Sequence, residues 1–156
     1  MKAMRRTAAA FFALAMALSL AACGASESTV VLRGTDDSSG IPTTDTWTLT
    51  AKGDIVQTMK EVLELDLSDY DDETKDILIS TFETTIVEAA KDIDGVTCTS
   101  QTSGSTYTIE LTVDCTGSAV KEAADAKLIT LDGSSDRISL KQTQASLEGQ
   151  GYEVVE

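Results

Sequence analysis

Strict alternation of apolar and polar residues in the first half of the chain predicts β-strands. In Thr46–Ala51 every second residue is apolar, which places Trp47, Leu49 and Ala51 on one face of an extended strand. A short turn containing a glycine follows, and Ile55–Leu67 continues as a second, longer strand. Because two strands joined by a tight turn form a β-hairpin, this pair predicts the first hairpin of an antiparallel sheet.

Three further segments have the composition of strands. Thr29–Arg33 is β-branched and apolar, and the turn-forming residues of Gly34–Thr44 separate it from the first hairpin. Later in the chain, Val96–Gln101 and Thr106–Thr116 flank a turn at Ser103-Gly104 and predict a second hairpin. Its inner face is expected to carry Tyr107, Ile109, Leu111 and Val113.

In the middle of the chain the apolar residues recur every three or four positions, which predicts a helix. Its apolar stripe consists of Leu78, Phe82, Ile86, Ala89 and Ile93. The acidic stretch Asp69–Asp76 precedes the stripe, where carboxylates cap free amides, and Gly95 is expected to end the helix. Ala119–Lys127 is weakly helical, and Ser139 is placed to cap a last helix that runs through Leu147.

The order of hairpin, long helix, hairpin and C-terminal helix is typical of the α+β class. We therefore expect an antiparallel sheet of two hairpins plus an N-terminal strand, packed against one long helix, with a short C-terminal helix. One face of the sheet lies against the helix and the other meets water, where the many threonines belong. The pattern contains no internal repeat, so residues 29–156 are expected to form a single α+β domain.

The N-terminus has the three parts of a secretory signal peptide. Basic residues precede the apolar run Ala8–Leu20, which is too short to span a membrane. Leu20–Cys23 then resembles the bacterial lipobox, with two alanines before a cysteine whose thiol can take a diacylglycerol. The pattern predicts a lipoprotein signal peptide at residues 1–22 and a lipidated tether at 23–28. The alternative is an ordinary cleaved signal in which the cysteine is incidental.

Charge and composition narrow the partners of the protein. The chain has 26 acidic and 12 basic residues, and its net charge of −14 repels the phosphates of nucleic acid. It contains no His, which excludes His-ligated metal sites and Ser-His-Asp triads. An acidic surface is also repelled by anionic headgroups, so the lipid on Cys23 has to hold the protein. We therefore expect a lipid-anchored protein on the extracytoplasmic face of the cell membrane.

Four groups of residues occur in an order that matches a known family. They are the lipobox through Cys23, the strand from Trp47 with its turn Lys52-Gly53-Asp54, the helix end Ile93-Asp94-Gly95-Val96, and the tail Ser139–Tyr152 with Leu147-Glu148 and Gly151-Tyr152. As an ordered set they resemble the YehR-like family of small bacterial lipoproteins, over the whole mature chain. The resemblance implies an α+β lipoprotein domain of no established activity, and it carries over no catalytic residue.

Carboxylates are the only abundant reactive groups, and a cluster of them precedes and enters the long helix. It consists of Asp66, Asp69, Asp71, Asp72, Glu73 and Asp76. A calcium loop of the EF-hand type needs glycine at its sixth position, but the sixth residue is Asp71 counted from Asp66 and Thr74 counted from Asp69. Paired carboxylates also serve glycoside hydrolases, yet the sole tryptophan, Trp47, is expected in the core. We expect no catalytic residue, no bound metal and no cofactor.

Cys98 and Cys115 lie on the predicted second hairpin and match no motif of the family. Export would place them in an oxidising compartment, and parity puts Cys98 on the face of Val96 and Cys115 on the face of Val113. The predicted turn sets Cys98 opposite Ile109, so a disulfide needs a bulge or bend that brings the two Cα atoms to about 5.5 Å. A disulfide and two buried thiols both remain compatible with the sequence.

Together these features predict a lipoprotein without enzymatic activity. The leading hypothesis is a binding or accessory module that contacts another envelope protein, or a cationic or peptide ligand, through its acidic or sheet surface. A second hypothesis is a carrier of a small apolar ligand between helix and sheet. A third, a carboxylate-dependent hydrolase, has the least support.

Replacing Cys23 with Ser should block lipidation and normal processing, because attachment depends on one sulfur. The basic residues Lys2, Arg5 and Arg6 and the apolar run would still direct export. Cell fractionation with mass mapping of the N-terminal peptide measures both effects. A wild-type N-terminus that begins after Cys23, or that carries an unmodified thiol on protein found in the medium, would contradict the lipoprotein assignment.

Overall fold

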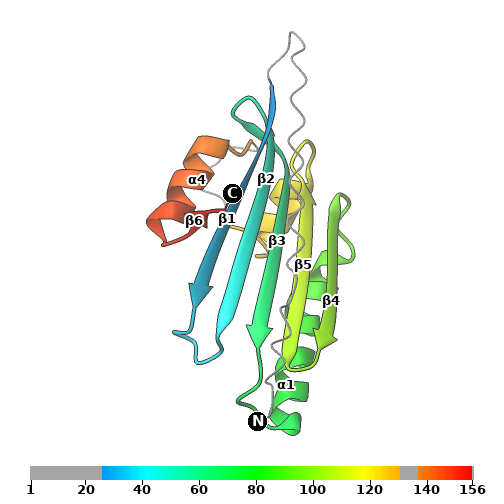
Figure 1. The fold of residues 1–156 in the computed structure, drawn as a ribbon. Helices are drawn as coiled ribbons and strands as arrows, with labels where there is room; N and C mark the ends of the chain where they lie inside the picture. The colour runs from blue at the N-terminus through cyan, green and yellow to red at the C-terminus, as the bar shows by residue number, and fades with distance from the viewer. Residues whose placement is uncertain (1–25, 131–136, 156) are drawn as a thin grey trace, which may run out of the picture.

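The computed structural model describes residues 26–130 and 137–155, and its main element is a six-stranded antiparallel sheet (Figure 1). The strands are β1 (Glu27–Asp36), β2 (Thr43–Lys52), β3 (Ile55–Asp66), β4 (Val96–Ser103), β5 (Thr106–Asp114) and β6 (Glu153–Val154). Their order across the sheet is β4-β5-β3-β2-β1-β6. The hairpins β2–β3 and β4–β5 and the N-terminal strand β1 are the ones that the sequence predicts, which confirms the α+β class.

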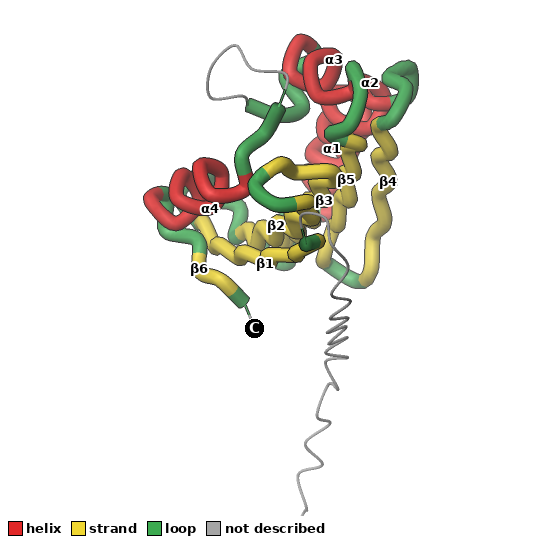
Figure 2. The backbone as a smooth tube through the Cα atoms, turned by 90° about the horizontal axis from the view of Figure 1, so that it is seen from above, coloured by secondary structure: helices red, strands yellow, loops and turns green. Residues whose placement is uncertain are grey.

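The helices all lie on one face of this curved sheet, as the view along it shows (Figure 2). They are α1 (Asp72–Phe82), the π-helical turn η1 (Glu83–Val87), α2 (Glu88–Ala90), α3 (Ala119–Asp125) and α4 (Leu140–Gly149). The first three follow one another without a break and form the long predicted helix. The short C-terminal helix is α4.

The covered face of the sheet holds the apolar half of each alternating pattern. Leu49 and Ala51 of β2 are fully buried, and the predicted inner face of β5 is buried along its whole length. One core cluster lies around α3 and α4, and a second cluster, which includes Leu65 and Tyr107, lies under α1. Burying these side chains is the main force that holds the helices on the sheet.

The opposite face of the sheet carries the alternate positions, many of them threonine, as expected. On this face Arg33 Nε donates to Thr46 Oγ1 (3.2 Å), and Lys60 pairs with Glu110 (2.8 Å). These polar side chains lie across neighbouring strands, where cross-strand contacts stabilise a solvated sheet face. The alternation therefore sorts the residues of the sheet into a covered and an open side.

The structure corrects several predicted boundaries. The turn between the first two strands spans only residues 37–42, because β1 continues to Asp36 and pairs with β2 over its full length. The long helix ends at Ala90, five residues before Gly95. The π-turn adds a residue to one turn of the helix, so Val87 and Ala90 are buried while Ala89, on the predicted stripe, is only partly buried. The edge strand β6 was not predicted from the sequence.

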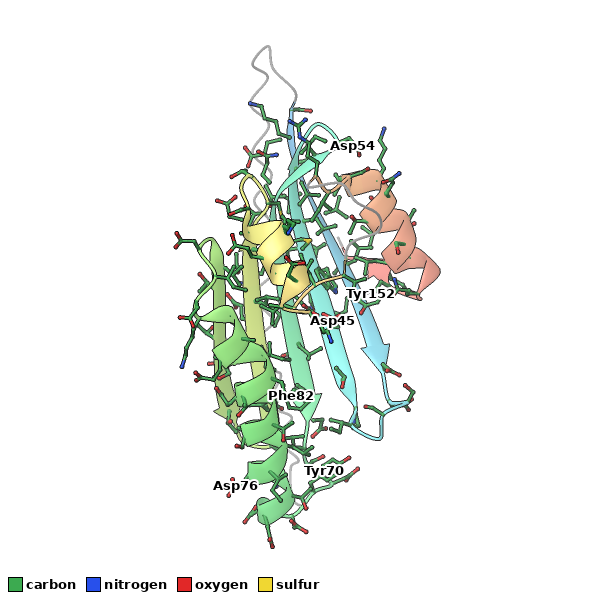
Figure 3. The ribbon with its side chains drawn as sticks, turned by 180° about the vertical axis from the view of Figure 1, so that it is seen from behind. Asp45, Asp54, Tyr70, Asp76, Phe82 and Tyr152 are labelled. Carbon is green, nitrogen blue, oxygen red and sulfur yellow. The ribbon has the colours of Figure 1, made fainter. Side chains whose placement is uncertain are left out.

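Two predicted helix caps are confirmed, and one of them is tied to the sheet. Asp71 Oδ1 accepts from the Thr74 amide (2.8 Å) at the start of α1. Ser139 Oγ accepts from the Gln142 amide (3.3 Å) at the start of α4, and it donates to Asp54 Oδ2 (2.8 Å). Asp54, in the β2–β3 turn, thereby fixes the first turn of α4 above the sheet (Figure 3).

Replacing Asp54 with Asn should loosen α4. In the folded protein the Lys141 amide (3.0 Å) and the Ser139 hydroxyl hold the pKa of Asp54 below its ordinary value of 3.8. A group whose pKa falls on folding stabilises the fold above its unfolded pKa, and this stabilisation is lost as the pH falls below 3.8. Hydrogen exchange of the α4 amides should therefore be several-fold faster in Asp54→Asn at neutral pH. Asp76→Asn, at an exposed position on α1, is the matched control, and equal exchange in both variants would refute the anchor.

Candidate functional site

A cavity of about 700 Å³ lies between the covered face of the sheet and α4. Its walls come from β2, β3, the segment before α4, α4 itself, and Gln150 and Tyr152, which follow α4. The apolar part of the lining consists of Trp47, Met59, Ile129, Ile138 and Leu147, and the polar part includes Asp45, Glu61, Gln142, Thr143 and Tyr152. A cavity of this size, with an apolar wall and a few polar groups, has the dimensions of a small-molecule site.

Asp45 is the central polar group of this cavity. Its Oδ2 accepts from the Trp47 indole Nε1 (2.9 Å) and from the Tyr152 hydroxyl (2.6 Å), and Figure 3 shows Asp45 beside Tyr152. Its Oδ1 is buried and has no hydrogen-bond partner, which is true of no other buried side-chain oxygen or nitrogen in residues 26–130 and 137–155. Burial raises the pKa of Asp45, although the two donated hydrogen bonds oppose the rise.

Tyr152 reaches Asp45 because two glycines permit it. Gly151 has a φ of 97°, and this left-handed residue turns the chain back toward the sheet after α4. Gly34 lies opposite Asp45 in the β1–β2 register, and a Cβ on Gly34 would lie only 2.9 Å from the ring of Tyr152. The absence of a side chain at Gly34 lets the aromatic ring cross β1.

Glu61 is the second carboxylate of the cavity. It lies on β3 between Met59 and Leu63 on the covered face, directly opposite Trp47 in the β2–β3 register. Burial, and after it the charge of Asp45, raises the pKa of Glu61 to about 8. The carboxyl of Glu61 is therefore protonated at neutral pH.

Glu61 also lines a smaller cavity of about 120 Å³, together with Lys127 and apolar residues of β3, β5 and η1. Glu61 thus lies where the space under α4 meets the space beside α3 and the π-turn. The two carboxylates together offer a proton donor, a buried acceptor and negative charge. These are the properties of a site for a hydrogen-bonding or cationic ligand, and also of a proton-transfer pair.

The cysteines are placed differently from the expectation. The β4–β5 register sets Cys98 opposite Leu111 instead of Ile109, because the hairpin turn is centred on Gly104 and Ser105. Both Cys98 and Cys115 are free cysteines in the structure. Cys115 lies four residues beyond Leu111, about 13 Å along the strand, whereas a disulfide needs Cα atoms about 5.5 Å apart. Burial raises the pKa of each thiol to about 11.

The remaining predicted site residues contribute nothing to the cavity. Cys23, the predicted lipidation site, lies outside the described residues. The acidic stretch before α1 supplies the cap Asp71, and within the described ranges no group of three or more Cys, Asp or Glu side chains is placed to hold a metal ion. None of the described helices is long and apolar enough to cross a membrane.

Sequence reasoning missed the cavity and its two carboxylates. Trp47 was expected in the core, and it does pack against the core cluster, but it also lines the cavity and donates to Asp45. One signal was available, because Asp45 and Glu61 are acidic residues at positions that the alternation assigns to the covered face. A buried carboxylate in an apolar row is unusual enough to mark a candidate site.

The fold and the site define a small α+β domain with a one-sided sheet and a cavity beneath its C-terminal helix. The chain belongs to the family described as "Protein of unknown function (DUF1307)", which matches residues 35–153. The YehR-like resemblance of the sequence is thereby confirmed. No curated protein matches the chain by sequence.

Two solved structures share the fold. The NMR structure of the E. coli YehR protein is similar with a TM-score of 0.64 and 18% sequence identity, covering 83% of this chain and 92% of that one. The NMR structure of a protein from Streptococcus pneumoniae TIGR4 has a TM-score of 0.60 and 14% identity, and the match covers 99% of both chains. At these identities the likeness shows the fold alone.

Replacing Glu61 with Gln should change how stability depends on pH. Because the folded pKa of Glu61 is about 8 and its ordinary value is 4.5, folding takes up a proton between these two pH values. The free energy of unfolding of the wild type should then fall as the pH rises from 4.5 to about 8. The raised pKa of Asp45 contributes a slope of the same sign, beginning at its ordinary value of 3.8. Urea denaturation at a series of pH values should give a clearly shallower slope for Glu61→Gln. Glu64→Gln, at an exposed position on the same strand, should keep the wild-type slope.

Proposed function

We propose that the protein is a lipid-anchored binding lipoprotein of the cell envelope that holds a small ligand in the cavity between the sheet and α4 and performs no catalysis on it. The observation that supports this function is the cavity of about 700 Å³, which is lined by Asp45, a carboxylate whose buried Oδ1 has no hydrogen-bond partner. This proposal combines two of the hypotheses from the sequence. It takes the binding role from the first, and from the second, the carrier, it takes the position of the ligand between helix and sheet.

The energetics of Asp45 favour a ligand. A buried polar atom without a hydrogen-bond partner costs about 1–3 kcal/mol, and more for a charged group. A ligand that donates a hydrogen bond to Oδ1 would remove this cost on binding. In a domain whose cavity binds nothing, this atom would only destabilise the fold, because an apolar residue at position 45 would be buried without the desolvation cost of a carboxylate.

The described surface gives less support to a docking role. The large apolar side chains that are most exposed in residues 26–130 and 137–155 are Ile55, Ile77, Val154 and Val155. Ile77 lies on α1, near the β4 edge of the sheet, and the two valines lie at or after β6, which is the opposite edge. Residues scattered in this way do not mark a protein-binding patch.

Location at the envelope rests on the sequence. The signal peptide and lipobox that end at Cys23 predict export and a lipid anchor. The predicted tether of residues 23–28 is shortened in the structure, because β1 already begins at Glu27, four residues after Cys23. A binding domain held close to the membrane can capture a small molecule there or pass it to a membrane protein. Asp45 and Glu61 also resemble an acid and base pair, but Asp45 already accepts two hydrogen bonds at Oδ2, which suits a fixed binding group.

A substitution that fills the cavity tests this function. Thr143 lines the cavity from α4 and is partly buried, so Thr143→Phe should occupy the space of the ligand. Ala145→Phe, at an exposed position on the same helix, is the matched control. The predicted mature chain, residues 23–156 carrying Cys23→Ser, is titrated with the neutral probe 4-phenylbutanol, and emission of the sole tryptophan, Trp47, reports binding inside the cavity.

Saturable binding to the wild type and to Ala145→Phe, weakened at least about tenfold in Thr143→Phe, is the expected result. Equal binding by all three proteins would place the probe elsewhere and remove the support for a cavity ligand. Near-ultraviolet circular dichroism of each variant checks that the fold is kept.

A further inference from the structure

We infer that the ligand of this cavity is an organic cation, an amine or related nitrogen cation on an apolar body, whose charged group lies between Asp45 and Glu61. The inference rests on the proposed binding function and specifies the chemical class of its ligand. Its basis is the arrangement of donors, acceptors and charges around the two carboxylates.

The hydrogen bonds of Asp45 leave one of its two oxygens without a partner. Trp47 and Tyr152 both donate to Oδ2, and these bonds fix the carboxylate and support its ionised form. Oδ1 is buried and accepts nothing, and the residue lines the cavity. An ionised carboxylate is only an acceptor, so the missing partner has to be a donor, and a charged donor forms the stronger bond.

Glu61 adds a second carboxylate on the same side of the cavity. In the β2–β3 register it lies opposite Trp47, and Asp45 is diagonal to it on the same face. Diagonal residues on neighbouring strands have their Cα atoms about 7–8 Å apart. An ammonium group can bridge two carboxylates at such a separation. Trp47 is a neighbour of both carboxylates, opposite Glu61 and two residues along β2 from Asp45, and it lines the cavity, where its ring can offer a cation an aromatic face.

The charged neighbours of Glu61 agree with a cationic ligand. Neither Asp45 nor Glu61 forms an ion pair with another described residue. The other titratable groups around Glu61 are Cys98 on β4 and Tyr152 after α4, together with Lys127 in the smaller cavity and the exposed Arg137 in the lining of the larger one. An anionic ligand would bring its charge against Asp45 and would keep Glu61 protonated, while the net charge of −14 draws cations toward the protein.

Binding of a cation should release a proton. Burial and Asp45 raise the pKa of Glu61 to about 8, so its carboxyl is protonated at neutral pH. A positive charge beside Glu61 lowers this pKa, and the proton then leaves to the solvent as the ammonium takes its place. Affinity for the cation should accordingly increase as the pH rises toward 8, as long as the amine itself stays protonated.

Three probes of one shape separate the charge of the ligand from its size. They are 4-phenylbutylamine, the neutral 4-phenylbutanol and the anionic 4-phenylbutyrate, each titrated into the predicted mature chain with Trp47 emission as the readout. The amine should bind about 10- to 100-fold more tightly than the alcohol, and the acid should bind least. Calorimetry of the amine in two buffers of different ionisation enthalpy should show release of up to one proton.

The variants assign these effects to the two carboxylates. Asp45→Asn and Glu61→Gln should each remove most of the preference for the amine while binding of the alcohol is kept, and Glu61→Gln should also abolish the proton release. Glu64→Gln, at an exposed position on β3, should leave both unchanged. Binding of 4-phenylbutanol by Asp45→Asn shows that the variant still has a formed cavity.

The outcomes separate the two proposals. If the alcohol binds and Thr143→Phe blocks it, but the amine binds no better, the cavity is a ligand site and the cation inference is wrong. If none of the three probes binds, both the binding function and the inference are overturned. A preference for the amine that Asp45→Asn and Glu61→Gln leave intact would place the cation at another acidic site and would also refute the inference.

Discussion

Asp45 lies on the covered face of β2, in a row that continues with Trp47, Leu49 and Ala51. A carboxylate in this row cannot be covered by an apolar helix without a large desolvation cost. The structure meets this cost in part through Trp47 and Tyr152, which both donate to Oδ2. The position of Tyr152 in turn depends on the turn after α4 and on the bare backbone at Gly34. The space beneath α4 is thus organised around one acidic side chain.

A third inward-facing carboxylate, Glu83, has hydrogen-bond partners that Asp45 lacks. Glu83, at the start of the π-turn, accepts from the Ser100 hydroxyl and from the Tyr107 hydroxyl (2.9 Å), and no buried atom of that group lacks a partner. Tyr107 is buried in the core cluster under α1, so this arrangement ties the long helix to β4 and β5. Asp45 differs because it lines the cavity and only one of its two oxygens has hydrogen-bond partners. The contrast favours a structural role for Glu83 and a binding role for Asp45.

Most of the fold follows from local patterns in the sequence. Alternation correctly assigned the covered faces of β2 and β5, and Ser139 marked the start of α4, because strand pleating and helix capping depend on residues close together in the chain. The errors fall where longer-range contacts decide. The π-turn shifts the buried side of the long helix to Val87 and Ala90, and β6 exists only because β1 offers it an edge. A two-residue change of hairpin register likewise moved the expected partner of Cys98 to Leu111.

The candidate site shows the limit of local patterns more sharply. The sequence by itself determined that Asp45 and Glu61 interrupt apolar rows, and its N-terminal pattern predicts export and an anchor at Cys23. Only the tertiary structure decided that the two carboxylates share a cavity, since the β2–β3 register sets Glu61 diagonal to Asp45. The hydroxyl of Tyr152 donates to Asp45 from a position 107 residues further along the chain. Tyr152 lies between α4 and β6, and the pairing of β6 with β1 holds this segment at the sheet. Pairing of distant segments has no signature in local spacing, because hydrophobic burial over the whole domain selects it.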